Sequence, residues 1–284
     1  MKPLAGILWH LVHVQPLGLS LTLLAAVGLA GCFQSSTIIN VNADGSGTIN
    51  ERMLLTGAAL AQLRAFAALG GGGGQDINPI TEDQARAAAT SMGSGVTYVS
   101  STPIANGDAQ GRAIVYAFTD INQVRISQQP PAPGGMTIRA PGVTTADGPA
   151  VTFALARQPD GNLLLRIIVP TPKVPPADTA PPAGAGPRSS PQQVAMIKQL
   201  IAGAHLSIAV EPSGRLVRTS SPFVEGQRVT LLDLDLDEAT KDEAVVSRLQ
   251  GVRSIDDAKA ALKDVPGVKI NFDPETTIEF TPEK

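Results

Sequence analysis

A single histidine, His205, lies outside the apolar N-terminal segment, so the chain has few residues that could act as a catalytic base. Residues 204–211 alternate apolar and other side chains, which is typical of a β-strand. Nucleophilic catalysis needs a base beside its nucleophile, and no G-x-S-x-G motif or second metal ligand accompanies His205. We therefore interpret His205 as a surface-facing strand residue, with a base or a metal ligand as the alternative.

Three acidic residues, Asp233, Asp235 and Asp237, alternate with leucines. An EF-hand loop opens in this way, but it needs Gly at its sixth position and Glu at its twelfth, where this chain has Glu238 and Ala244. On a β-strand the three carboxylates would share one face and the leucines the other. We predict a strand with a polar outer face, Asp237 as the cap of the next helix, and no metal or cofactor, with a calcium site as the alternative.

Two glycine-rich stretches lack the pattern of a phosphate-binding loop. Neither Asp44–Gly47 nor Gly70–Gly74 is followed by Lys-Ser/Thr, so we predict a hairpin turn and a flexible loop. The formal net charge is −3 and basic residues form no block. A nucleic-acid partner is therefore not expected.

Carboxylates could act in pairs in a glycoside hydrolase. Glu51, Glu225 and Asp273 have no spacing that identifies such a pair, although these pairs are recognised in space and not in sequence. We therefore predict that the chain is not an enzyme. A hydrolase of envelope polymers that uses paired carboxylates remains the alternative.

The chain begins with Met1-Lys2 and an apolar run whose core spans 17–29. This run is rich in small residues and is shorter than the ~20 apolar residues that span a bilayer. It is typical of a cleavable signal peptide, and it ends at Leu29-Ala30-Gly31-Cys32. Cys32 is the only cysteine, so we expect no disulfide within the chain.

The stretch from Leu29 to Cys32 resembles the lipobox of bacterial lipoproteins. The resemblance implies cleavage between Gly31 and Cys32, a diacylglyceryl group on the Cys32 thiol, and fatty acids such as palmitate as the anchor. Two or more acyl chains hold a protein stably on a membrane. Phe33, not Asp, follows the cysteine. In that family this favours the periplasmic face of the outer membrane in a host with two membranes. A plain signal peptide with an incidental cysteine is the alternative.

Periodicity and turn residues predict the elements that must position these side chains. Strands are expected in hairpins 38–55 and 151–169, and in 96–101, 112–119, 204–211, 216–220, 228–236 and 268–280. Helices are expected in 57–69, 81–93, 190–201, 238–250 and 255–264. The order favours an α+β fold, with a mainly antiparallel sheet packed with several short helices.

We predict a single domain with a Pro-rich disordered insertion. The parts are a signal peptide (1–31), a lipidated tether (32–36), an N-terminal part of the α+β domain (37–169), a Pro/Ala/Gly-rich linker or insertion (170–190) and a C-terminal part (191–284). The stretch 170–190 has too little apolar bulk to contribute to a core.

Two segments, Ile38–Gly47 and Ile208–Val217, are similar to segments of the LppM-type bacterial lipoproteins. The similarity would span about 36–236. It implies an α+β domain and a role in binding lipids or in the envelope, and it carries no catalytic motif. The chain departs from that family in ending in charged residues (Glu283 and Lys284), without a C-terminal membrane helix.

Together these patterns predict a non-enzymatic lipoprotein of the cell envelope. It would be anchored through Cys32 on the extracytoplasmic side of a membrane. Its partner would be an apolar ligand, such as a lipid, or an envelope protein. The sequence assigns no ligand-binding residues.

Overall fold

The structure is a computed structural model that describes residues 33–61, 64, 81–127, 150–170, 203–242, 244–245, 248 and 255–283. Cys32, the stretch 171–190 and the expected helix 190–201 lie outside the described residues. So do parts of the expected helices 57–69 and 238–250.

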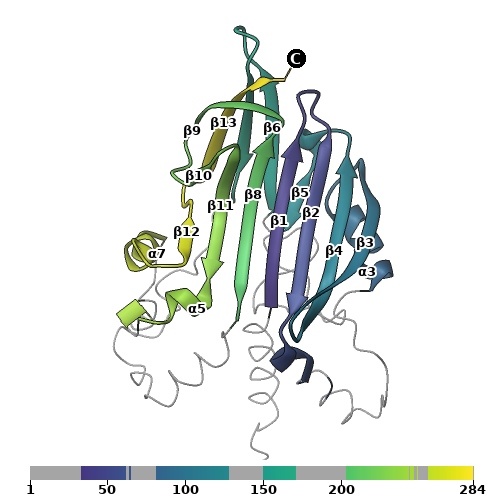
Figure 1. The fold of residues 1–284 in the computed structure, drawn as a ribbon. Helices are drawn as coiled ribbons and strands as arrows, with labels where there is room; N and C mark the ends of the chain where they lie inside the picture. Colours follow the sequence, from purple (N-terminus) through teal and green to yellow (C-terminus); the bar gives the residue numbers. More distant parts are fainter. Residues whose placement is uncertain are drawn as a thin grey trace, which may run out of the picture.

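Eight strands form the larger sheet, called sheet A (Figure 1). Its order is β10-β11-β8-β1-β2-β4-β3, with β12 also paired to β11. The strands are β1 (Phe33–Val41), β2 (Gly47–Leu55), β3 (Val96–Asn106), β4 (Ala109–Phe118), β8 (His205–Pro212), β10 (Val224–Glu225), β11 (Arg228–Asp235) and β12 (Val268–Ile270). The pair β1 and β8 is parallel, and the other described pairs are antiparallel.

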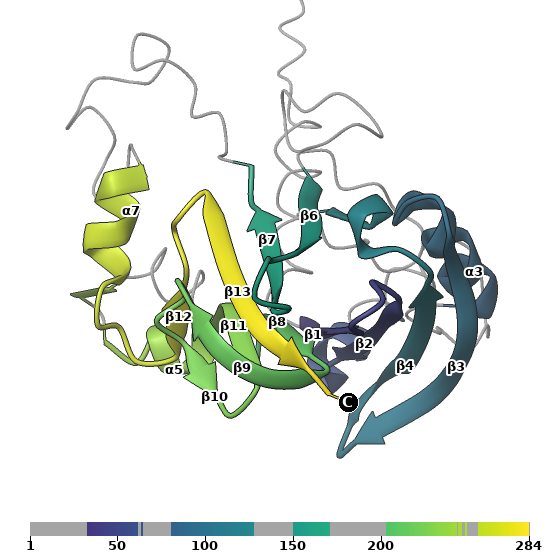
Figure 2. The same ribbon diagram turned by 90° about the horizontal axis from the view of Figure 1, so that it is seen from above.

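Five strands form sheet B, in the order β5-β6-β7-β13-β9. They are β5 (Arg125–Ser127), β6 (Ala150–Arg157), β7 (Leu163–Ile168), β9 (Gly214–Thr219) and β13 (Glu275–Pro282). Viewed from above, the two sheets form two facing layers (Figure 2). Strands from before and after residues 171–202 pair in both sheets, since β1 pairs with β8 and β7 with β13.

The described helices are short and lie at the periphery. They are α3 (Glu82–Ser91), α5 (Leu236–Ala239), α7 (Ile255–Leu262) and the 3-10 turn η2 (Ile121–Gln123). The capping box expected from the sequence is confirmed, because Thr81 accepts from the Gln84 amide and the Gln84 side chain accepts from the Thr81 amide. Within the described part of the chain, no helix is long and apolar enough to cross a membrane.

The expected α+β fold, in which helices pack on one sheet, is wrong. The protein is mostly β and resembles a sandwich, because sheet B and not a layer of helices covers the inward face of sheet A. The physical reason is that an alternating strand shows only that one face is buried. It does not show whether a helix or a second sheet covers that face.

The main core lies between the sheets towards the upper end of Figure 1, where the turns 42–46 and 158–162 and the C-terminus lie. Both sheets contribute fully buried side chains to it, including Ile39, Ile49, Tyr116, Leu165, Val210, Ile278 and Phe280.

Both hairpins expected from the sequence are confirmed. β1 pairs with β2, and β6 pairs with β7, each around a short turn. In the first turn Asp44 Oδ1 accepts from the Ser46 amide at 2.9 Å and from the Ser46 hydroxyl at 2.7 Å. These hydrogen bonds stabilise the carboxylate and lower the pKa of Asp44. The glycine-rich segment at 44–47 is thus a hairpin turn.

Candidate functional site

The inward face of sheet A changes character along the central strands β1 and β2. Near the upper end the inward residues are apolar, and Ile39 lies opposite Ile49. One step lower, Thr37 lies opposite Glu51, and below it Ser35 lies opposite Met53. Ser35 and Thr37 are only 8% and 7% exposed. We call Ser35, Thr37 and Glu51 the polar island.

Apolar side chains surround the polar island within the same face. Ile208 of β8 is the neighbour of Thr37, Leu206 is the neighbour of Ser35, and Ile114 of β4 is the neighbour of Glu51. Leu206 and Ile208 keep part of their surface exposed, whereas Val210, higher on β8, is fully buried. On the β8 side, the lower part of the inward face is therefore covered less completely than the upper part, whereas Met53 and Ile114 beside the polar island stay buried.

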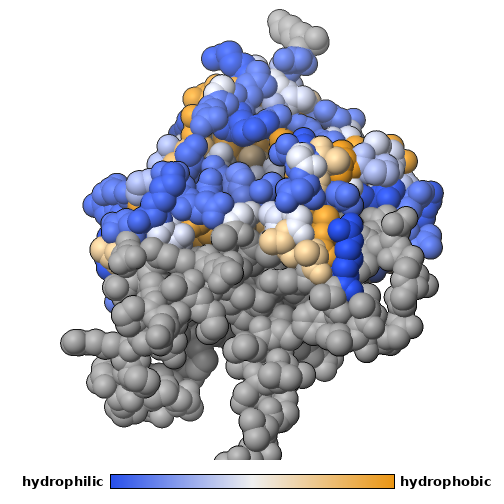
Figure 3. Space-filling model, turned by 60° about the horizontal axis from the view of Figure 1, so that its bottom comes forward, coloured by the Kyte–Doolittle hydropathy of each residue, from blue (hydrophilic) through white to orange (hydrophobic). Residues whose placement is uncertain are grey.

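The surface seen when the lower end is turned forward differs from this inward face. There the described residues are mainly hydrophilic, with only small hydrophobic patches between them (Figure 3).

Glu51 is the electrostatically unusual member of the polar island. Burial raises the pKa of its carboxyl group to about 7, because the charged form loses its hydration. Among the described residues, no hydrogen bond or ion pair to its carboxyl is present, although the residue as a whole keeps some exposure. A carboxyl in this setting carries a partial desolvation cost, which no described side chain offsets.

The two tyrosines of the chain lie side by side on the same inward face, Tyr116 nearer to Glu51 and Tyr98 one strand further away. Tyr116 lies one step above Ile114 on the inward face of β4. Burial first, and then the charge of Glu51, raise the pKa of its hydroxyl. Its ring meets that of Tyr98 edge to face, with centroids 6.5 Å apart. The Arg86 guanidinium of α3 lies 4.3 Å from the centre of the Tyr98 ring. Helix α3 therefore holds the rings in place.

One cation, Arg112, lies on the same inward face, next to Met53. It is 8% exposed, and it donates from Nε to the Ser101 hydroxyl at 2.5 Å and from Nη2 to the Ser101 carbonyl at 3.1 Å. Ser101 is on β3, on the opposite side of β4 from β2. These contacts direct the guanidinium away from Glu51.

The described chain starts at the lower end of the sandwich, directly after Cys32. Residues 33–36, expected to be a tether, are the first residues of β1. Phe33 packs against the small cluster of Leu55, Ala59 and Leu60 as well as against the main core. Cys32 itself lies outside the described residues, so its lipidation stays a prediction.

His205 is exposed on the outward face of sheet A, as expected from the sequence. Its Nε2 lies 2.7 Å from Asp233 Oδ1. The nearby Ser207 donates its hydroxyl hydrogen to Ser36 at 2.9 Å and not to the imidazole. The three residue types of a serine hydrolase thus occur together, but the serine is not hydrogen-bonded to the base.

The three alternating aspartates have three different partners. Asp233 contacts His205, Asp235 accepts from the Glu238 amide at 3.0 Å, and Asp237 accepts from the Gly203 amide at 2.7 Å. Asp235 and not Asp237 is the N-cap of α5, so that detail of the prediction is wrong. In the described part of the chain, no group of three or more acidic, histidine or cysteine side chains is placed to hold a metal ion.

The carboxylates considered for a hydrolase pair are not brought together. Glu225 pairs with Lys269 at 3.1 Å, and Asp273 lies 4.0 Å from Lys259. Four strand spacings separate β10, which carries Glu225, from β2, which carries Glu51. At about 4.8 Å for each spacing, the two strands are roughly 19 Å apart.

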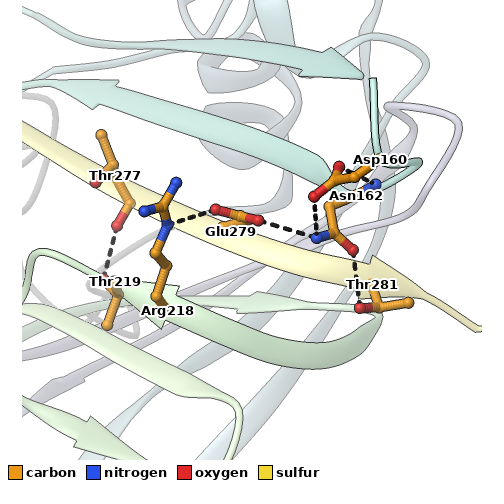
Figure 4. Close-up of polar contacts among 7 residues, drawn as sticks. All are labelled: Asp160, Asn162, Arg218, Thr219, Thr277, Glu279 and Thr281. Carbon is orange, nitrogen blue, oxygen red and sulfur yellow. Dashed lines mark hydrogen bonds and ion pairs between the residues drawn. The ribbon is translucent and has the colours of Figure 1, made fainter. Parts of the chain in front are cut away.

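A fully packed carboxyl, Glu279, which is 6% exposed, lies on β13 near the upper end (Figure 4). Arg218 donates to its Oε2 at 2.5 Å and Asn162 donates to its Oε1 at 2.9 Å. Asn162 also donates to Asp160 and accepts from the Thr281 hydroxyl at 3.0 Å. This carboxylate is held from β9 and from the turn between β6 and β7, and each of its oxygens has a hydrogen-bond partner.

Sequence reasoning did not assign the polar island or the Glu279 network. A signal for the polar island exists, because Thr37 and Glu51 have the same parity along their strands as Ile39 and Ile49. The network of Glu279 joins residues more than 60 positions apart, and no local pattern reports it.

Comparisons with known proteins find little. No protein-family model matches the chain, and no curated protein matches it. Among solved structures, the NMR structure of the folded domain of the Mycobacterium tuberculosis LppM protein is similar in shape. It is 9% identical, 90% of this chain and 92% of that chain are covered, and the TM-score is 0.33. LppM also gives its name to the family that the two sequence segments resemble. These values assign neither a family nor a function to this chain.

Proposed function

We propose that this chain is a non-enzymatic lipoprotein of the cell envelope that holds one amphipathic lipid at the polar island. The observation that carries the proposal is Glu51, a partly exposed carboxyl that lies beside Thr37 on an otherwise apolar face and has no described hydrogen-bond or ion-pair partner. The polar head of the lipid would contact Glu51, Thr37 and Ser35. Its acyl chains would lie along the partly exposed Leu206 and Ile208.

The energetics favour a binding role over a structural one. An apolar side chain at position 51 would stabilise the fold more than Glu51 does, because partial burial of an unpaired carboxylate costs free energy. Such exceptions to good packing concentrate at functional sites. Partly exposed apolar residues beside convergent polar groups are also the usual lining of a small-molecule site.

The expected anchor brings this site close to a membrane. If Cys32 carries the lipid, it is one residue, or about 3.8 Å between Cα atoms, from Phe33 in β1. The lower end of the sandwich would then rest on the extracytoplasmic surface of the membrane. Ser35 and Thr37 follow within the same strand, so a lipid could pass from the bilayer to the site over a short path.

Native mass spectrometry of the full chain, extracted from membranes in detergent, tests the ligand. We expect an adduct with the mass of one lipid. Ser35→Leu fills the polar island and should remove the adduct. Ser36→Leu is the matched control, because Ser36 is adjacent but faces outward towards Ser207. The absence of an adduct from the unmodified chain, or equal adducts in both variants, would contradict the proposal.

The anchor is tested separately by growing cells with radiolabelled palmitate. The unmodified chain should take up the label and fractionate with membranes. Cys32→Ser should lose the label, and it should be released in soluble form or remain unprocessed. A Cys32→Ser protein that is still processed and membrane-bound would show that the anchor lies elsewhere.

A further inference from the structure

We infer that the head group held at the polar island is uncharged and hydrogen-bonding, as in the free hydroxyl of a diacylglycerol, and is not a phosphate or carboxylate. This inference rests on the proposed function and specifies its ligand. The evidence for it is the set of hydrogen-bond donors, acceptors and charges that the described residues place on the inward face of sheet A.

The polar island offers both donors and acceptors within a small area. Thr37 and Glu51 are direct cross-strand neighbours, whose Cβ atoms lie about 4.5–5.5 Å apart in an antiparallel pair. Ser35 is on the same face, two residues along β1. Each hydroxyl can donate and accept, and the carboxyl can accept in either protonation state. A hydroxyl or an ester carbonyl would find a complementary partner here.

An anionic head group would find little counter-charge on the described strands of this face. Among the described inward-facing residues of β1, β2, β4 and β8, Arg112 is the only cation, and its guanidinium is bonded to Ser101. Arg52, although next to Glu51 in sequence, is exposed on the opposite face. A phosphate beside Glu51 would place two acidic groups together in a poorly hydrated site, which costs far more than it would in water.

The flanking residues suit acyl chains. Leu232 and Leu234 of β11 pair with Ile208 and Leu206 of β8, so four aliphatic side chains continue the inward face on one side of the polar island. All four keep some exposure, in contrast to the fully buried Val229 higher on β11. A ligand with an uncharged head and long apolar chains would match both parts of this surface.

The test compares dioleoylglycerol with dioleoyl phosphatidic acid, which share their acyl chains and differ in the phosphate. Native mass spectrometry of the full chain in detergent at pH 8, with equal amounts of both lipids, measures the preference. We expect at least about a tenfold preference for dioleoylglycerol, as one close like-charge pair would produce. Glu51→Gln keeps the hydrogen bonding but removes the charge, so it should reduce the preference about tenfold.

Each outcome decides a different claim. If the unmodified chain binds neither lipid, the proposed function fails together with this inference. If it binds both equally, or binds phosphatidic acid better, only the head-group assignment fails. If Glu51→Gln leaves the preference unchanged, Glu51 does not select the head group, and that too overturns the inference. Ser36→Leu, with its change on the outward face, should behave as the unmodified chain does.

Discussion

Two carboxyls among the described residues, buried Glu279 and partly exposed Glu51, have opposite surroundings. Near the upper end, Glu279 accepts hydrogen bonds from Arg218 and Asn162, so both of its oxygens have partners. In the lower half, burial raises the pKa of Glu51 to about 7, and none of the described residues forms a hydrogen bond or ion pair with its carboxyl. The fold thus provides hydrogen-bond partners for the Glu279 carboxyl, and none of the described residues does so for Glu51.

This difference extends to the strands that carry the residues. On β1, Ile39 belongs to the close-packed core, while Thr37, two residues earlier on the same face, belongs to the polar island. In the upper half the Glu279 carboxyl is paired, and side chains such as Ile39 and Phe280 are fully buried. In the lower half Thr37 and Glu51 place polar groups inside an apolar face, an arrangement that fits the ligand proposed above.

The largest expected difference is between two substitutions on β1. Ile39→Ala removes a fully buried side chain from the core, so it should lower the free energy of unfolding by about 2–5 kcal/mol. Thr37→Val replaces a hydroxyl that bonds to no described residue, so it should change the free energy by less than about 1 kcal/mol. Urea unfolding of both variants measures this. A loss of several kcal/mol in Thr37→Val would remove the distinction between the halves.

Replacing Glu51 should stabilise the protein. Burial raises the pKa of Glu51 to about 7, from 4.5 for an ordinary glutamate, so the folded state binds the proton more tightly. Wild-type stability therefore falls as the pH rises from about 4.5 to about 7, and stays reduced above that. At pH 8, Glu51→Leu should gain on the order of 3 kcal/mol, and the gain should shrink towards pH 4. Urea unfolding across this range measures it.

Glu51→Gln is the control for this pH dependence. It cannot ionise, so the decline in stability between about pH 4.5 and 7 should become shallower in both variants. The gain in stability should be smaller than for leucine, because the amide remains a buried polar group. If Glu51→Leu is less stable than wild type at pH 8, the carboxylate has a stabilising partner and the comparison with Glu279 fails.

The matching substitution in the upper half should have the opposite sign. Glu279→Leu removes the acceptor of Arg218 and of Asn162, and we expect it to cost about 1–3 kcal/mol. The Arg218 side chain is 79% exposed and can be hydrated, which keeps the cost in the lower part of that range. Urea unfolding beside Glu51→Leu gives the direct comparison. A gain in stability here would mean that the two carboxyls do not differ as argued.

Much of the local structure could be predicted from the sequence, and the arrangement of layers could not. The alternation around Ile39 and the turn at Asp44–Gly47 predict the first hairpin, and Thr81 with Gln84 predicts the start of α3, because these signals lie within a few residues of each other. The cover of sheet A depends on pairing between β7 and β13, over a hundred positions apart. No periodicity within a segment reports such pairing.

The candidate site was visible in sequence only as an inconsistency. Thr37 and Glu51 occupy core-facing positions of their strands, but a polar residue in an alternating segment also fits a strand with irregular burial. Pairing of β1 with β2 brings the two residues side by side, and the surrounding Ile114 and Ile208 make the contrast clear. Structure was therefore needed to separate a functional exception from an ordinary surface residue.

Helix α3 gives the smallest expected effect and a control for both halves. Thr81→Ala removes the hydroxyl that accepts from the Gln84 amide, so it should cost about 1 kcal/mol. Thr81 is exposed, and its hydroxyl is bonded to the Gln84 amide and not to Glu51 or Glu279. Stability should therefore fall equally at pH 5 and pH 8 in urea unfolding, and lipid adducts should persist in native mass spectrometry. If Thr81→Ala changed the pH dependence, α3 would control Glu51 through Arg86, Tyr98 and Tyr116, and the polar island would not be independent of the helix.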